Sequence, residues 1–333
     1  MCQNMGNKFM TIMSRYFKIA WSSKDLFDNW FSAGLKYFVF YKLLKKRIYI
    51  DVMCKDGFAL RISPEAFGAL ISGYYDSVFT KLSCVEKEKI LIDDFPVPLH
   101  ELEVSGTNAI IAVKYGWKFN ENYKCWVKDG IKFKHARDIL PDVFIHGEYE
   151  SLEVSGKNVI DIGATYGDST IYFISRGAEK VIAVEPCPHM YKELVENLKL
   201  NNLLDRVVPI NAALGSKSGK NIIKCPGGKA VVNVITLKDI KNIMDKLGID
   251  SAVLKMDCEG CEYDVILNDY ESVRMFNEIY FEYHMHISKM PVEILLEKLS
   301  SDFECKIVSD EKFYKRHPEG KSLGLVRCTK KHL

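Results

Sequence analysis

A group of glycines and acids in the second half of the chain could hold a nucleoside cofactor. Gly163 follows a buried apolar run and lets the backbone turn sharply and approach a ligand, and Gly167 allows close packing of the helix that follows. Asp161 lies within the apolar run, and Glu185 stands 24 residues later, at the end of the next run. A carboxylate at that second position suits the two hydroxyls of a ribose.

The residue that begins the helix helps to choose between cofactors. A dinucleotide site usually shows GxGxxG and holds a pyrophosphate on the helix N-terminus. Here Asp168 stands at the helix start, directly after Gly167, and would repel a pyrophosphate. S-adenosylmethionine carries no phosphate and has a positive sulfonium and an ammonium group, so it is compatible with this acid. A nicotinamide-dependent oxidoreductase stays open as a disfavoured alternative.

A second group of polar residues could perform methyl transfer. Transfer from a sulfonium is an in-line displacement that needs alignment, and a hydroxyl acceptor also gains from a general base. His284 is the best candidate for that base, because it follows a buried run at the expected carboxyl end of a strand. Asp257 could act as a base, hold the cofactor's amino group, or bind a divalent ion together with Glu282. A solvated helix start is the structural alternative for the acids at 257–262.

These residues need a scaffold, and the pattern from residue 158 onward alternates short apolar runs with helical segments. This alternation predicts a parallel sheet with helices on both faces, whose strand ends bind ligands. We expect strands at 158–163, 181–184, 206–210, 252–256 and 278–281, and helices at 170–176 and 190–200.

Several ordered motifs resemble the FkbM family of S-adenosylmethionine-dependent methyltransferases. The resemblance covers roughly residues 140–330, and residues 1–140 match nothing specific. The motifs are Val159–Ser169, Val184–Pro186, Thr236–Asp239, Leu254–Glu262 and Phe281–His284. Cys258 and Cys261 depart from the family, which usually has small or branched apolar residues there, and this leaves a redox or metal role open.

The resemblance implies a fold and a division of the chain. It implies an α/β, Rossmann-like class I methyltransferase fold: a seven-stranded, mostly parallel sheet with helices on both faces and an antiparallel last strand. Segments 304–308 and 323–328 would be the closing pair. We expect an FkbM-like methyltransferase domain at 141–333 and an α+β extension at 1–140, made of a helix and β-hairpins.

The resemblance also implies site residues and an activity. The implied activity is O-methylation of a hydroxyl on a sugar, a glycan or glycolipid, or another small metabolite; a non-catalytic partner subunit is a further alternative. From their own chemistry at the strand ends, we expect His284, Asp257 and Glu282 to be catalytic, and we assign no residue to a metal. Glu185 would bind the ribose and Asn211 and Ala212 would lie by the adenine. The other expected contacts of S-adenosyl-L-methionine are Asp161, Gly163, Ala164, Thr165, Gly167 and Asp168.

Composition excludes some classes of protein. The 333 residues are 47% apolar and 27% charged, which suffices for a sizeable core. A net charge of +2, from 46 basic and 44 acidic residues, argues against a nucleic-acid-coating protein. Mean hydropathy is −0.08 and no uncharged apolar run reaches about 18 residues, so we expect no transmembrane span.

Cysteine usage and the first residues predict a cytoplasmic location. Residues 1–13 lack the apolar core of a secretory signal. The ten cysteines include a single CxxC, at Cys258 and Cys261, whereas a zinc site would need a second such pair. We therefore expect reduced, mostly buried cysteines.

The extension begins with an amphipathic stretch. Apolar residues recur at helical spacing from Leu26 to Phe38, and Lys42, Lys45, Lys46 and Arg47 follow. We expect a helix packed on the catalytic domain, with a membrane-surface or partner-binding helix as the alternative. Short β-branched runs with turn signals at 55–57 and 128–130 predict hairpins between residues 47 and 154.

Overall fold

The computed structural model describes residues 18, 19, 21–139 and 141–331, and the chain divides into two compact units, Met1–Pro141 and Asp142–Leu333. The segment in which the sequence shows no secretory signal lies outside the described residues. Among the residues that are described, no helix has both the length and the apolar character needed to cross a membrane.

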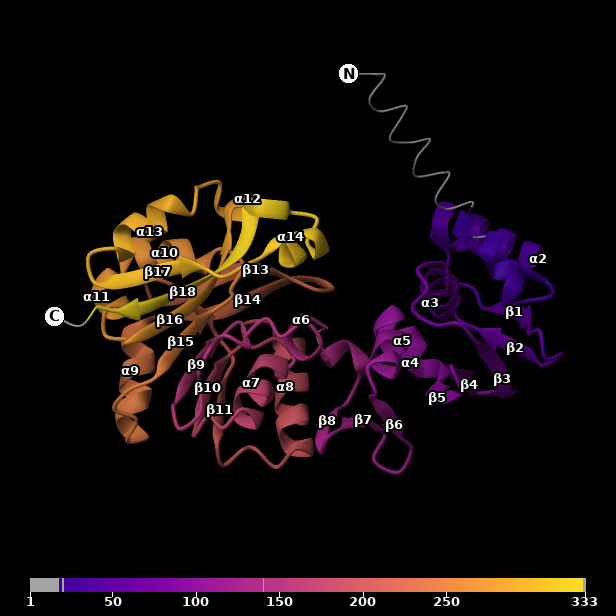
Figure 1. The fold of residues 1–333 in the computed structure, drawn as a ribbon, viewed down its shortest axis with the longest axis horizontal. Coiled ribbons are helices and arrows are strands. Elements are labelled where there is room, and N and C mark those ends of the chain that lie inside the picture. The colour runs from indigo at the N-terminus through magenta and orange to yellow at the C-terminus, as the bar shows by residue number, and fades with distance from the viewer. Residues whose placement is uncertain (1–17, 20, 140, 332–333) are drawn as a thin grey trace, which may run out of the picture. The chain divides into compact units, whose positions relative to one another are not determined.

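The second unit is built on a seven-stranded sheet with the order β11-β10-β9-β15-β16-β18-β17 (Figure 1). The first five strands run parallel to one another, and β18 runs antiparallel to both β16 and β17. This order and the single reversed strand define the class I methyltransferase fold, so the predicted fold is confirmed. The strands are β9 Val159–Ile162, β10 Val181–Val184, β11 Val207–Ile210, β15 Val253–Met256, β16 Glu278–His284, β17 Phe303–Ile307 and β18 Leu323–Lys330.

Helices cover both faces of this sheet, because the central strands are apolar on both sides. The side chains of Ile160, Leu254 and Phe281 pack in one core cluster with α9, α10, α11 and α13. The alternate residues point to the opposite face, where α7 lies on β9 and α8 lies on β11 (Figure 1). The helices of this unit are α7 Asp168–Ser175, α8 Pro188–Leu200, α9 Leu237–Lys246, α10 Cys261–Asn268, α11 Tyr270–Val273, α12 Met285–Ser288, α13 Glu293–Leu299, α14 Glu311–Arg316 and the short 3₁₀ turn Gly320–Ser322.

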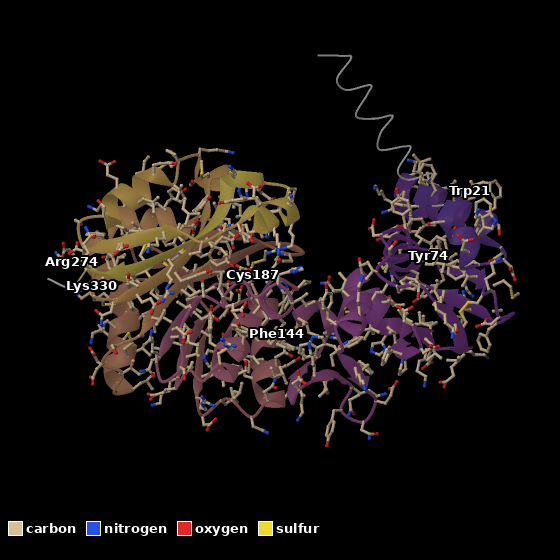
Figure 2. The ribbon with its side chains drawn as sticks, in the orientation of Figure 1. Trp21, Tyr74, Phe144, Cys187, Arg274 and Lys330 are labelled. Carbon is tan, nitrogen blue, oxygen red and sulfur yellow. A yellow bond between two sulfur atoms is a disulfide. The ribbon has the colours of Figure 1, made fainter. Side chains whose placement is uncertain are left out.

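A small three-stranded sheet in this unit has no counterpart in the sequence-based prediction. It consists of β12 Ala213–Leu214, β13 Gly219–Cys225 and β14 Gly228–Ile235, with β14 in the middle. A disulfide between Cys225 and Cys187 fastens the hairpin to the start of α8 (Cys187 is labelled in Figure 2). The hairpin therefore lies close to the loop that follows β10.

The pairing of cysteines contradicts the expectation of reduced residues. Eight cysteines form the disulfides Cys54–Cys84, Cys187–Cys225, Cys258–Cys261 and Cys305–Cys328. Among the described residues, Cys125 is the cysteine left as a free thiol, and it is buried. Because three of the four pairs join residues more than 20 positions apart, spacing along the chain could not reveal them.

The first unit contains the expected hairpins, arranged in small antiparallel sheets. These sheets are β1–β2, β3–β4–β5 and β6–β7–β8. The elements are β1 Ile50–Met53, β2 Ala59–Ile62, α3 Pro64–Tyr75, β3 Leu82–Glu86, β4 Lys89–Ile92, β5 Phe95–Pro98, α4 Leu99–Ser105, α5 Thr107–Lys114, β6 Lys118–Asn120, β7 Cys125–Lys128, β8 Ile131–Phe133 and the 3₁₀ turn Ala136–Asp138; α6 Pro141–Phe144 follows at the boundary.

The single packed helix expected over residues 26–38 is wrong. The chain forms a 3₁₀ turn at Ser23–Asp25, then α2 at Trp30–Lys36, then a wider helical turn at Tyr37–Leu43. Phe27 interrupts the helix because its backbone bridges to Cys54 and its side chain is fully buried. Phe31 and Leu35, four residues apart on α2, are 67% and 54% exposed.

Candidate active site

The turn after β9 has a close approach that only glycine allows. Gly163 has φ +76°, and a Cβ atom added there would lie 1.7 Å from the backbone oxygen of Asp257. The ends of β9 and β15, which are paired in the sheet, therefore touch through their backbones. Gly167, with φ +88°, precedes the first residue of α7 and packs against Leu194 of α8. Both glycines predicted from the sequence lie in this turn.

Asp161 is fully buried beneath the turn, and its oxygens are already engaged. One oxygen accepts hydrogen bonds of 2.7 Å from the hydroxyls of Ser169 and Thr170 on α7, and the other lies 2.9 Å from Lys255 Nζ. Lys255 also donates to the carbonyl of Gly163 at 3.1 Å. Burial disfavours the charge of Lys255, but the carboxylates of Asp161 and Asp257 outweigh it and raise the pKa of Lys255. Asp161 thus holds the turn in shape, and direct contact with a cofactor stays a prediction.

Glu185 connects β10 to the same turn. Its two carboxylate oxygens accept backbone N–H groups of Thr165 and Cys187, at 3.0 and 2.7 Å. Asp168 Oδ1 accepts from the Thr165 hydroxyl at 2.6 Å. Burial raises the pKa of both Glu185 and Asp168 to about 7, against these hydrogen bonds. A ligand that donates hydrogen bonds to Glu185 would favour its ionised form.

The remaining predicted cofactor residues lie around this carboxylate. Asn211 Nδ2 donates to the backbone oxygens of Glu185 and Pro186, at 2.8 and 3.1 Å. Ala164 and Ala212 are buried, and the N–H of Ala164 donates to Val184. The ends of β9, β10 and β11 thus bring together residues from 161 to 212.

His284 ends β16 and is oriented by a buried carboxylate. Its side chain is 3% exposed, and Nδ1 lies 2.9 Å from Oε1 of Glu262, which is fully buried. Its other ring nitrogen, Nε2, lies 3.8 Å from Asp257 Oδ1 and 3.7 Å from Glu259 Oε2. Burial disfavours the imidazolium, but the hydrogen bond and charge of Glu262 outweigh it and raise the pKa of His284 to about 9.

Two further acids, Glu282 and Glu148, lie near Asp257. Glu282 is 8% exposed, and its carboxyl group has no hydrogen-bond or ion-pair partner in the part of the chain that the structure describes. Burial, together with the charges of Asp257 and Glu148, raises the pKa of Glu282 well above its ordinary range. Burial and the charge of Asp257 also raise the pKa of Glu148, to about 8. The cluster therefore favours a cationic ligand.

The structure thus brings the predicted residues to one edge of the sheet, in two neighbouring groups. The turn residues gather at β9, β10 and β11, and Asp257, Glu282 and His284 gather at β15 and β16, with the Gly163–Asp257 contact joining the groups. Sequence reasoning missed the roles of Lys255 and Glu148. A lysine inside a buried strand was a usable signal for the first, whereas nothing in the sequence marks the second.

The loop between Asp257 and α10 is closed by the disulfide Cys258–Cys261. Glu259 and Gly260 within it have positive φ values of 56° and 107°. Because these cysteines bond to each other, neither offers a thiolate to a metal in this state. The disulfide instead fixes the short loop that carries Asp257 and Glu259.

Part of this unit is similar to known proteins. Residues 161–305 match the model of the methyltransferase FkbM domain. Uncharacterized protein 65 of Sulfolobus islandicus filamentous virus (isolate Iceland/Hveragerdi) is 35% identical over 92 residues, 27% of this chain and 58% of that protein. Ribosomal protein L11 methyltransferase of Geobacter sp. (strain M21) is 36% identical over 74 residues, 22% of each chain. The chain thus spans less than two thirds of the length of either relative.

Among solved structures, methyltransferase FkbM from Methylobacillus flagellatus KT is similar, with a TM-score of 0.38 and 18% identity over 52% of this chain and 43% of that chain. The matched region contains the glycine turn, Glu185, Asp257, Glu282 and His284. Residues 161–305, less than half of this chain, are thus similar to the methyltransferase FkbM domain.

Proposed function

We propose that this protein transfers a methyl group from S-adenosyl-L-methionine to a hydroxyl oxygen of a small-molecule, sugar or glycolipid acceptor. The contact of Gly163 with the backbone of Asp257 is the observation that carries the proposal. It places the ends of β9 and β15 together, so a cofactor seated on the glycine turn would present its methyl group beside Asp257 and His284.

Different residues around the turn would bind different parts of the cofactor. Glu185 would accept hydrogen bonds from the ribose hydroxyls, because it ends β10 and each oxygen has capacity beyond its one backbone hydrogen bond. Ala164, Thr165 and Gly167 would line the turn, and Asn211 and Ala212 would lie by the adenine. The acids beyond Gly163 would favour the sulfonium and ammonium groups.

The transfer would consume one methyl cation equivalent and release one proton. A lone pair on the acceptor oxygen forms the new C–O bond while the S–CH₃ bond breaks and its electron pair returns to sulfur. The product is S-adenosylhomocysteine, and the hydroxyl proton must leave the acceptor oxygen. We assign the handling of that proton to the cluster of His284, Asp257 and Glu282, in which Asp257 is the most accessible, at 27% side-chain exposure.

A lipid-linked acceptor is supported by the surface of the first unit. Trp21, Phe31, Leu35, Leu43 and Leu44 are all at least 49% exposed. Trp21 lies beside α2 (Figure 2), with its ring 5.4 Å from that of Trp30. The chain continues directly into exposed Lys45 and Lys46, whereas the next residue, Arg47, is paired with Glu65 and Glu103. Exposed apolar side chains beside cations suit the surface of an anionic lipid bilayer, so we propose peripheral membrane contact there.

Two observations point to different cellular locations for the protein. Cytoplasmic location was the sequence-based prediction and stays a prediction. The four disulfides weigh against it, because such bonds persist in oxidising compartments and are rare where glutathione keeps thiols reduced.

Calorimetric titration with S-adenosylhomocysteine, and separately with NAD, tests the cofactor. We expect saturable binding of S-adenosylhomocysteine alone, weakened at least about tenfold by Glu185→Ala through the loss of charge-assisted hydrogen bonds to the ribose. Glu179→Ala, an exposed acid before β10, is the matched control and should bind normally. Binding of NAD instead would favour the oxidoreductase, and binding of neither would favour a non-catalytic subunit.

A further inference from the structure

We propose that Asp257, Glu282 and His284 form a binding site for one divalent cation, which holds the hydroxyl oxygen of the acceptor. This inference deepens the proposed function and rests on it for the role of the acceptor. The ligand atoms of these three side chains all lie within 4.8 Å of one another, although Asp257 follows β15 and the other two residues belong to β16.

The separations fit a shared ion. A cation about 2.1 Å from each of two ligand atoms holds them no more than about 4.2 Å apart. Asp257 Oδ1 and His284 Nε2 are already 3.8 Å apart, too far for a hydrogen bond. Glu282 lies on β16 two residues before His284, so both side chains leave the same face of that strand. Small side-chain rotations would bring all three ligands to coordination distance.

His284 is held as a histidine ligand usually is. Metal-bound histidines commonly donate their second N–H to a carboxylate, which fixes the tautomer and turns the other nitrogen toward the metal. Here Glu262 Oε1 lies 2.9 Å from Nδ1 and also accepts the backbone N–H of His284 at 3.1 Å. Glu262 Oε2 accepts from the N–H of Gly260, so the orienting carboxylate is itself fixed.

Glu282 is the independent observation that points to a ligand. The residue is 8% exposed, and among the described residues nothing donates a hydrogen bond to its carboxyl group. An ionised carboxyl group that is mostly removed from water and has no partner carries a desolvation cost. A cation between Glu282, Asp257 and His284 would supply the missing partner. Lys255, a nearby buried cation, cannot do so because it is paired with Asp161.

The three ligands indicate which class of metal ion would bind and how that ion would act on the acceptor hydroxyl. Two carboxylates and one imidazole suit a first-row divalent ion such as Mn²⁺, which prefers oxygen ligands. Three protein ligands leave positions open, and an acceptor hydroxyl bound there would have a lowered pKa. With the ion present, His284 would act as a ligand, so the proton that the cluster takes in the metal-free case would pass from the acceptor to water. An acceptor with a second oxygen next to the reacting hydroxyl, as in many sugars, could bind through both.

Titration of metal-free full-length protein with Mn²⁺, followed by electron paramagnetic resonance, tests the site. We expect one tightly bound ion per chain and spin-echo modulation from a directly bonded imidazole nitrogen. Glu282→Gln and Asp257→Asn should each weaken Mn²⁺ binding at least about tenfold. Saturable binding without the nitrogen signal would overturn the assignment of His284, and the absence of saturable binding would overturn the whole site.

Glu259→Gln is the matched control, because it removes one nearby negative charge from an exposed side chain outside the three-ligand group. It should leave Mn²⁺ binding within about threefold of wild type, since the charge it removes is screened by solvent. An equal loss in Glu259→Gln and Glu282→Gln would show a diffuse acidic field and overturn the site. Circular dichroism and thermal melting identify any variant that fails to fold, and the nitrogen signal in wild type does not depend on variants.

A combined titration separates this inference from the proposed function. We expect S-adenosylhomocysteine and Mn²⁺ to bind together. Displacement of Mn²⁺ by S-adenosylhomocysteine would show that the acids serve the cofactor's ammonium group and would overturn the cation site alone. Binding of Mn²⁺ without binding of S-adenosylhomocysteine would overturn the proposed function and leave the cation site standing.

Discussion

Lys255 and Asp161 form an ion pair inside the sheet, with 2.9 Å between Nζ and Oδ1. They are directly opposite each other in the register of β15 and β9, and both side chains are at most 1% exposed. Lys255 also donates to the carbonyls of Ile162 and Gly163, where β9 turns toward α7. One buried cation thus ties the glycine turn to the neighbouring strand.

Replacing Lys255 with methionine should strongly destabilise the protein. The variant leaves the Asp161 carboxylate buried and without its cation, and such a loss typically costs about 3–5 kcal/mol. Lys157→Met is the control, because its ion pair with Glu278 is partly exposed and should be worth about 1 kcal/mol or less. Urea unfolding of both variants measures the difference. Equal stabilities would show that the buried pair contributes no more than a surface pair.

Replacing Gly163 with alanine should abolish cofactor binding even where the protein still folds. The new Cβ would meet the backbone oxygen of Asp257 at 1.7 Å, so the ends of β9 and β15 must separate. Gly156→Ala is a matched control, because Gly156 has a similar φ of +68° but no atom within 4 Å of its added Cβ. In both variants the positive φ costs about 1 kcal/mol of backbone strain, but only Gly163→Ala also creates a steric clash.

Titration of both glycine variants with S-adenosylhomocysteine gives the readout. We expect at least about a hundredfold loss of affinity in Gly163→Ala, which corresponds to about 2.7 kcal/mol, and nearly normal affinity in Gly156→Ala. Normal binding in Gly163→Ala would show that the contact with Asp257 does not position the cofactor.

The sequence predicted those parts of the site that depend on residues close to one another along the chain. Gly163, Gly167 and Asp168 stand together around one turn, and short runs of valine and isoleucine mark the buried strands on which they depend. Glu185 could be found because the first two strands of such a sheet are separated by one helix of ordinary length. These features need no knowledge of distant contacts.

The features that the sequence did not predict depend on contacts between distant residues. Glu148 lies near Asp257, from which it is separated by more than a hundred residues of sequence. Cys305 can bond to Cys328 only because β17 pairs with β18. The segment after Leu26 has helical spacing, yet the bridge from Phe27 to Cys54 breaks the helix. In each case tertiary contact overrides or supplements the local pattern.

Affinity for S-adenosylhomocysteine should rise with pH through about 7. Burial raises the pKa of Glu185 to about 7, with Lys255 lowering and Asp161 raising it, whereas the ribose requires the carboxylate. Below pH 7 a proton must therefore leave on binding, and affinity should fall by up to about tenfold per pH unit. Asp168, whose pKa is also about 7, faces the same turn and acts in the same direction.

Calorimetry between pH 5.5 and 8, repeated with Glu185→Gln, measures this effect. The glutamine variant should bind weakly and lose the part of the pH dependence that comes from Glu185, while the part that comes from Asp168 remains. The raised pKa of Glu185 also affects the stability of the protein. Between pH 4.5, its ordinary pKa, and about pH 7, the folded state binds a proton that the unfolded state has lost. The contribution of Glu185 to the free energy of unfolding therefore falls as pH rises through this range. An unchanged pH profile in Glu185→Gln would assign the titration to another group.

Thiol counting should distinguish the two redox states of the protein. Protein made in an oxidising compartment should show no more than two free thiols after denaturation, those of Cys2 and Cys125, although the chain has ten cysteines. The double variant Cys187→Ser/Cys225→Ser removes one pair, closing 38 residues, and should lose about 2–4 kcal/mol of stability. Ten reactive thiols in such protein would instead support the reduced, cytoplasmic state.

Vesicle binding tests the exposed apolar surface of the first unit. The full chain should sediment with vesicles that contain phosphatidylserine and should bind less at high salt, because apolar insertion and attraction by Lys45 and Lys46 act together. Phe31→Ser/Leu35→Ser removes two exposed side chains from α2 and should weaken this binding severalfold. Leu204→Ser/Ile294→Ser is the matched control, since these residues are 47% and 38% exposed in the second unit and stand next to the acids Asp205 and Glu293. An equal loss in both double variants would indicate general hydrophobic adsorption, and no binding by the wild-type chain would remove the membrane from the proposed function.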